Sequence, residues 1–245
     1  MRVAESFRGG SHLPKQRKGG MPAEPEGLPD QRRGVTPQMR GRYPDYDVLA
    51  EADHWDRATR EVVLARLDPP PIRFFDESEV PTLAALCDTV TAQDREPRIP
   101  VLALVDQKLF EGKLDGFQYE DLPDDREVWR IVARGLDESA RELAYPSFGE
   151  APLDDRHSIC ERFAAGELSG GAWGELNVTR AWSVVMRGIL QAFYQHPWAW
   201  NEIGFGGPAY PRGYAALGVD RPEHWEREEE FALDPVEDTQ ARGLE

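Results

Sequence analysis

Apolar residues recur at intervals of three and four positions along most of the chain between residues 73 and 195. This period places them on one face of an α-helix, whereas a half-buried strand alternates apolar and polar residues. Alternation over five or more residues is not convincing anywhere in the sequence. The pattern therefore predicts an all-α fold, a compact helical bundle of about five to six helices.

Five of these helices can be bounded from the pattern. Asp76 and Glu79 resemble a capping box before the first helix, with Asp in place of the usual Ser or Thr. Pro100 suits the start of the second helix, and Gly112 suits its end. The clearest period covers the last of the five, which we expect to be the central helix of the core. The helices are expected at about residues 76–90, 100–112, 125–144, 154–165 and 177–195.

Composition divides the rest of the chain. Residues 1–42 are rich in Gly, Pro, Arg and Gln and contain few large aliphatic side chains, which predicts a disordered basic tail. Residues 43–72 are expected to form a helical arm and a Pro-rich linker. The helical domain then spans residues 73–226, and residues 227–245 are expected to form an acidic tail.

The chain carries 29 Lys and Arg against 45 Asp and Glu, a net charge of -16. Such a charge repels phosphate backbones and anionic lipids, so we expect neither nucleic-acid binding nor direct membrane insertion. We find no secretory signal and no twin-arginine leader, because Arg32 and Arg33 are not followed by an apolar run. These observations favour a cytoplasmic location and leave export as part of a complex open.

We find no motif that predicts catalysis, cofactor binding or metal binding in this chain. The glycines of residues 204–208 have the density of a phosphate-binding loop, but they follow a predicted helix rather than a strand. His157 and Glu161 lie four residues apart on a predicted helix, a spacing more typical of a surface interaction than of a metal site. Cys87 and Cys160 match no metal or disulfide pattern and are expected in the core, although their pairing stays open.

The segment of residues 194–214 stands out by its aromatic, glycine and proline content. Glycine and proline fix an irregular path, and large rings supply contact area at little entropic cost. We therefore expect it to bind a partner, and the alternative is that its rings pack on their own domain. His196 could instead place an imidazolium at the C-terminal end of the preceding helix. The candidate partner-binding residues are Tyr194, His196, Trp198, Trp200, Phe205, Tyr210, Arg212 and Tyr214.

The run from Tyr194 through Gly206-Gly207-Pro208 to Arg212-Gly213-Tyr214, behind a long amphipathic helix, resembles the end of the gluconate 2-dehydrogenase subunit 3 family. Residues 43–55, 73–75 and 98–106 are similar to one branch of that family, so the likeness covers about residues 43–226. It implies a small non-catalytic subunit that binds a large FAD-carrying subunit of the glucose-methanol-choline oxidoreductase type, sometimes beside a cytochrome subunit. FAD would then belong to the partner.

Two functions follow from these observations. The resemblance implies an accessory subunit that stabilises or matures an FAD-dependent sugar or alcohol dehydrogenase. The alternative is a self-sufficient helical enzyme whose site uses His196, Glu202 and Arg212.

Overall fold

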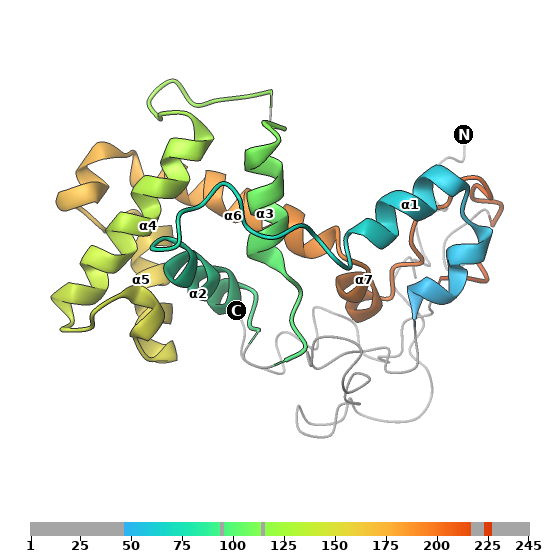
Figure 1. Cartoon of the computed structure of the whole chain (residues 1–245), viewed down its shortest axis with the longest axis horizontal. Helices are drawn as coiled ribbons and strands as arrows, with labels where there is room; N and C mark the ends of the chain where they lie inside the picture. The colour runs from blue at the N-terminus through green and yellow to red at the C-terminus, as the bar shows by residue number, and fades with distance from the viewer. Residues whose placement is uncertain (1–46, 94–95, 114–115, 217–222, 227–245) are drawn as a thin grey trace, which may run out of the picture. The chain divides into compact units, whose positions relative to one another are not determined.

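The computed structural model describes residues 47–93, 96–113, 116–216 and 223–226 (Figure 1). All regular structure in this part of the chain is helical, with seven α-helices and three 3-10 helices, so the all-α prediction is confirmed. The tails expected at residues 1–42 and 227–245 lie outside the described residues. The chain divides into two compact units, residues 62–199 and the described residues before Val62 and after Ala199.

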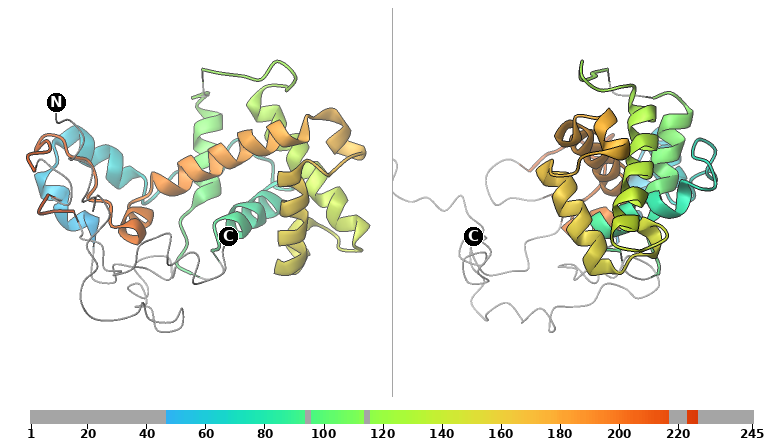
Figure 2. Two further views of the ribbon diagram at one scale, coloured as in Figure 1. Left: turned by 180° about the vertical axis from the view of Figure 1, so that it is seen from behind. Right: turned by 90° about the vertical axis from the view of Figure 1, so that its left-hand side faces the viewer.

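The larger unit, residues 62–199, contains the helices that the apolar pattern predicts. Helix α6 packs against α3, α4 and α5, and α2 packs against the same three helices (Figure 2). The helix expected near residues 177–195 is therefore central, as predicted. Its α-helices are α2 (Val80–Val90), α3 (Val101–Phe110), α4 (Asp125–Glu142), α5 (Leu153–Ala165) and α6 (Val178–Tyr194), and its 3-10 helices are η3 (Phe148–Glu150) and η4 (Gly171–Glu175).

Side chains at the helix starts satisfy backbone N–H groups that have no partner within the helix. Asn177 begins α6 by accepting a hydrogen bond from the N–H of Arg180 at 3.2 Å. Glu79 accepts one from the N–H of Asp76 at 2.9 Å, the bond expected of the Glu in a capping box. Asn177 thus fixes the start of α6 where the pattern predicts it, whereas α2 begins at Val80, four residues after Asp76.

Two tryptophans lie against glycines on helix faces. The ring of Trp173 covers Gly135 of α4 so closely that a Cβ atom there would come within 2.6 Å of it. The indole N–H of Trp173 also donates to Ser139 Oγ at 3.0 Å. Trp129 of α4 lies on Gly188 of α6, where a Cβ atom would come within 3.0 Å of the ring. The missing side chains at the two glycines therefore leave the space that these buried rings occupy.

A buried carboxylate holds the segment that leads into this bundle. Asp106 of α3 is only 1% exposed. It accepts three backbone N–H hydrogen bonds, from Arg73 at 2.8 Å, Phe74 at 2.9 Å and Phe75 at 3.0 Å. Phe75 is buried, and its ring centroid lies 5.9 Å from that of Trp129. Asp106 thus fixes the end of the proline-rich linker on the helical core.

The two cysteines are free thiols buried in this unit, Cys87 on α2 and Cys160 on α5. Burial raises the pKa of both thiols, to about 12 for Cys160. They therefore serve as small core residues, as expected from the sequence. In the described part of the chain, no helix combines the length and apolar character needed to cross a bilayer.

The smaller unit combines a segment that precedes the larger unit in the sequence with a segment that follows it. Its first segment holds η2 (Val48–His54) and the beginning of α1 (Arg57–Ala65). Its second contains the end of α7 (Pro197–Ile203) and the glycine-rich run after it. Asn201 joins the two segments, because its Oδ1 accepts a hydrogen bond from the N–H of Val48 at 2.8 Å.

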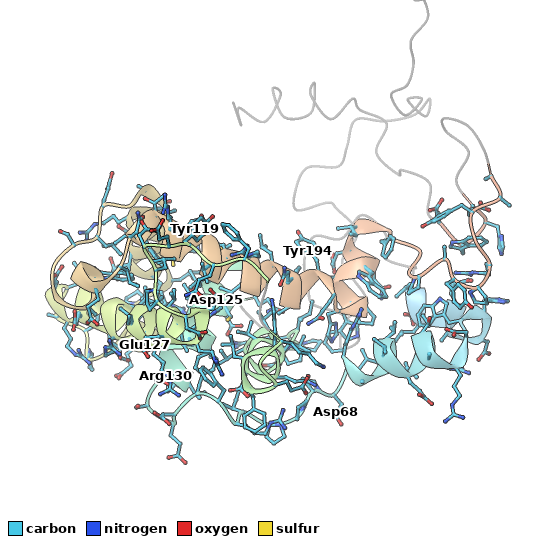
Figure 3. The ribbon with its side chains drawn as sticks, turned by 90° about the horizontal axis from the view of Figure 1, so that it is seen from above. Asp68, Tyr119, Asp125, Glu127, Arg130 and Tyr194 are labelled. Carbon is cyan, nitrogen blue, oxygen red and sulfur yellow. The ribbon has the colours of Figure 1, made fainter. Side chains whose placement is uncertain are left out.

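Replacing Asp106 with Asn should lower the free energy of unfolding by about 2 kcal/mol, because one acceptor oxygen becomes an NH2 group that faces N–H donors. Urea denaturation followed by circular dichroism measures the change. Asp68→Asn is the matched control, since Asp68 is exposed in the same linker (Figure 3), and it should change stability by less than about 0.5 kcal/mol. Equal stability of the two variants would contradict the role given to Asp106.

Candidate functional site

The aromatic segment, residues 194–214, contains a short helix that the apolar pattern does not predict. Helix α7 occupies residues that were expected to be irregular, Pro197–Ile203. Proline suits the first position of a helix, and His196 caps it, because His196 Nδ1 accepts a hydrogen bond from the N–H of Trp198 at 3.2 Å. Seven residues are too few to show a helical period, which explains why the pattern missed α7.

His196 is a buried, neutral imidazole. It is 1% exposed, and burial together with the nearby positive charge of Arg66 lowers its pKa to about 4. This lowered pKa does not favour the alternative role, an imidazolium at the C-terminal end of the preceding helix. The ring caps the start of the next helix instead, and it does so in the uncharged form.

After α7 the chain follows an irregular path that depends on two glycines. Gly207 has a φ of +75°, and a Cβ atom there would come within 2.9 Å of Val48 and 3.0 Å of Trp55. A Cβ atom on Gly206 would come within 2.6 Å of the ring of Trp225. The space beside each glycine is thus filled by side chains of the smaller unit, which explains the glycine density without a phosphate ligand.

Arg212 is held inside the smaller unit. Its Nη1 pairs with Glu51 Oε2 at 2.7 Å, and the exposed fractions of the two side chains are 13% and 23%. Its guanidinium group lies 3.9 Å from the ring centroid of the buried Trp225, a cation–π contact. Arg212 therefore connects the end of the aromatic segment to η2 and to Trp225.

The candidate partner-binding residues divide into buried and exposed groups. Trp200 is 6% exposed and stacks edge to face on Phe205, with ring centroids 5.4 Å apart. His196 is also buried, and Trp198 and Arg212 are partly exposed. The remaining four are exposed, with fractions of 47% for Tyr194, 39% for Phe205, 66% for Tyr210 and 58% for Tyr214. A partner could reach these four rings directly.

The residues of the alternative enzyme site are buried or paired with another residue of the chain. His196 and Glu202 are 1% and 7% exposed, and Arg212 is paired with Glu51. Neither His196 nor Glu202 is open to a substrate. His157 and Glu161 are exposed on α5, and among the described residues no three or more His, Cys, Asp or Glu side chains are arranged to hold a metal ion.

Comparison with known protein families gives one match. The profile described as Gluconate 2-dehydrogenase subunit 3 matches residues 77–207, more than half of the chain. The matched range runs from just before α2 to Gly207, so it includes Tyr194 and Phe205 but not Tyr210, Arg212 or Tyr214. No curated protein and no solved structure matches significantly.

Arg212→Ala should lower the free energy of unfolding by about 2 kcal/mol, because it leaves the Glu51 carboxylate without its charged partner and removes the contact with Trp225. Urea denaturation followed by circular dichroism measures the change. Tyr210→Ala, which removes an exposed ring, should stay within about 0.5 kcal/mol of wild type. A stable Arg212→Ala protein would show that the ion pair contributes little.

His196 should make stability depend on pH. Its folded-state pKa of about 4 lies below the value of about 6.5 for an unfolded histidine, so the unfolded state binds the proton more readily. The stabilisation is complete above about pH 6.5, and roughly 3 kcal/mol is lost as the pH falls toward 4. His196→Asn keeps an acceptor for the N–H of Trp198 but does not titrate. Denaturation between pH 7.5 and 4.5 should show a steeper loss for wild type, and parallel profiles would refute the assignment.

Proposed function

Because the chain belongs to the gluconate 2-dehydrogenase subunit 3 family, we propose that it is the non-catalytic small subunit of an FAD-dependent sugar or alcohol dehydrogenase. It binds a large FAD-carrying subunit of the glucose-methanol-choline type and stabilises or matures it. Hydride transfer takes place in the large subunit, and a cytochrome subunit can complete the assembly.

The observation that carries this proposal is the set of exposed rings on a firmly held backbone. Phe205, Tyr210 and Tyr214 lie at the surface of the segment that Gly206, Gly207 and Arg212 fix by close packing and an ion pair. Tyrosine is enriched among the residues that dominate binding energy at protein interfaces. A backbone that is already ordered loses little entropy when a partner binds. These three rings therefore form the leading contact surface, which we name the aromatic surface.

The environments of the buried polar groups are consistent with an accessory role. His196 is neutral and used as a helix cap, and the two thiols are protonated core residues. Arg212 and Asp106 bind groups of their own chain. Each of these groups has a structural function, which supports the assignment of the chemistry to the partner subunit.

The test is co-expression with the large flavoprotein subunit of the same organism, followed by affinity purification through a tag on this chain. The double variant Tyr210→Ser, Tyr214→Ser should recover at least tenfold less flavoprotein than wild type, because an interface anchor contributes on the order of 2 kcal/mol. The melting temperature of the variant alone should stay unchanged, since both rings are exposed.

Phe117→Ser is the matched control, since Phe117 is an aromatic residue that is 57% exposed and lies between α3 and α4. It should recover as much flavoprotein as wild type. Flavin absorbance should follow the large subunit and be missing from the small subunit purified alone. Equal recovery by the double variant and wild type would remove the aromatic surface from the interface. Failure of wild type to bind the flavoprotein would refute the proposed function.

A further inference from the structure

An open groove of about 810 Å³ lies within the larger unit, between residues 62–66, helix α3 and helix α6. Figure 3 shows α3 nearly end-on beside α6 and labels Tyr194 on α6. Tyr194 lines the groove with 47% of its surface exposed, and Val62 lines it with 56% exposed. The groove thus has apolar anchors within reach of another molecule.

The charge of the groove differs from that of the whole chain. Its lining includes three cationic side chains, Arg66, Lys108 and Lys113, and one carboxylate, Glu111, which pairs with Lys113 Nζ at 2.6 Å. The chain as a whole carries a net charge of -16. A positive site on a molecule of negative net charge can attract a negatively charged group that the molecule as a whole repels.

Two of the cations are held in position by the groove's own walls. Arg66 Nη1 donates to the carbonyl oxygen of Gln195, just after α6, at 2.9 Å. Lys108 Nζ donates to Gln191 Oε1 at 2.8 Å and so connects α3 with α6. Positioned charged groups lose less side-chain entropy when they bind a ligand.

The mixture of side chains indicates what kind of molecule fits. Leu104, Val105 and Ala192 form part of the lining, and long polar side chains such as Gln107 and Gln191 form the rest. Pockets for small molecules are lined mainly by apolar groups with few polar ones. Apolar contacts surrounded by polar side chains and charges are typical of protein interfaces. The groove therefore suits a segment of a polypeptide better than a small ligand.

We propose that this groove receives an acidic segment of the large flavoprotein subunit, an inference that rests on the proposed function. An apolar side chain of that segment packs on Val62 and Tyr194, the two exposed apolar residues of the lining, and a neighbouring carboxylate pairs with Lys108. The groove is then a second contact surface, distinct in composition from the aromatic surface, which contains no cation.

Gln191→Glu tests the charge. The new carboxylate keeps the size of the side chain and pairs with Lys108, so it lowers the positive charge of the groove where the partner's carboxylate would bind. The dissociation constant of the complex with the purified flavoprotein subunit should rise at least fivefold at low salt. The difference from wild type should shrink at high salt, because ions screen the repulsion. The melting temperature of the isolated chain should not fall, since Gln191 is exposed.

Ser158→Glu is the control for net charge. Ser158 is exposed on α5, which does not line the groove, and the substitution also adds one negative charge. It should leave the dissociation constant within twofold of wild type. If Gln191→Glu binds as tightly as wild type while Tyr210→Ser, Tyr214→Ser binds weakly, the groove inference fails and the proposed function stands. If wild type itself does not bind the flavoprotein, both fail.

A photo-reactive phenylalanine analogue in place of Tyr194 identifies the occupant. Irradiation of the complex should cross-link this chain to a flavoprotein peptide in which Asp or Glu neighbours an apolar residue, as read by mass spectrometry. Cross-linking to a second copy of this chain, or to a flavoprotein peptide without a carboxylate, would overturn the inference.

Discussion

The carboxylate of Asp106 organises one side of the helical domain. Three successive backbone N–H groups of residues 73–75 need acceptors once they leave water, and a single buried carboxylate satisfies all three. These hydrogen bonds hold residues 73–75 in place, so that Phe75 lies against Trp129. Trp129 in turn lies on Gly188 of α6. Contacts therefore run without a break from Asp106 on α3, through Phe75 and Trp129, to Gly188 on α6. The groove lies between these same two helices, and Gly188 lines it as well, so its geometry depends on these buried contacts.

The long amphipathic helices could be predicted from the sequence because their apolar residues repeat over several turns. The helices expected at residues 125–144 and 177–195 appear as α4 and α6 with ends shifted by one or two residues. The short elements η3, η4 and α7 could not be predicted, since three to seven residues show no period. The role of Asp106 was also missed. An acid on an otherwise apolar helix face was the available signal, but no spacing rule connects it to N–H groups more than 30 residues away.

The candidate site was predicted as one aromatic surface, and the structure separates its members by burial. Trp200 and His196 are buried, whereas Tyr210 and Tyr214 are exposed in the same stretch of sequence. Composition alone cannot make this distinction, because the groups that bury or pair the segment are distant in the chain. Val48 meets Asn201 across 153 positions, and Glu51 meets Arg212 across 161. Only the folded chain shows which rings remain available to a partner.

The two proposed contacts differ in how they relate to the family. The groove lies mostly within the matched residues 77–207, including Lys108, Gln191 and Tyr194. The aromatic surface extends beyond that range to Tyr210 and Tyr214, and its support comes from residues outside the range on both sides, Glu51 and Trp225. Under the proposed function, the groove would bind the flavoprotein mainly through residues within the match. The aromatic surface would add contacts from residues that the family profile does not cover, and such contacts can discriminate between partners.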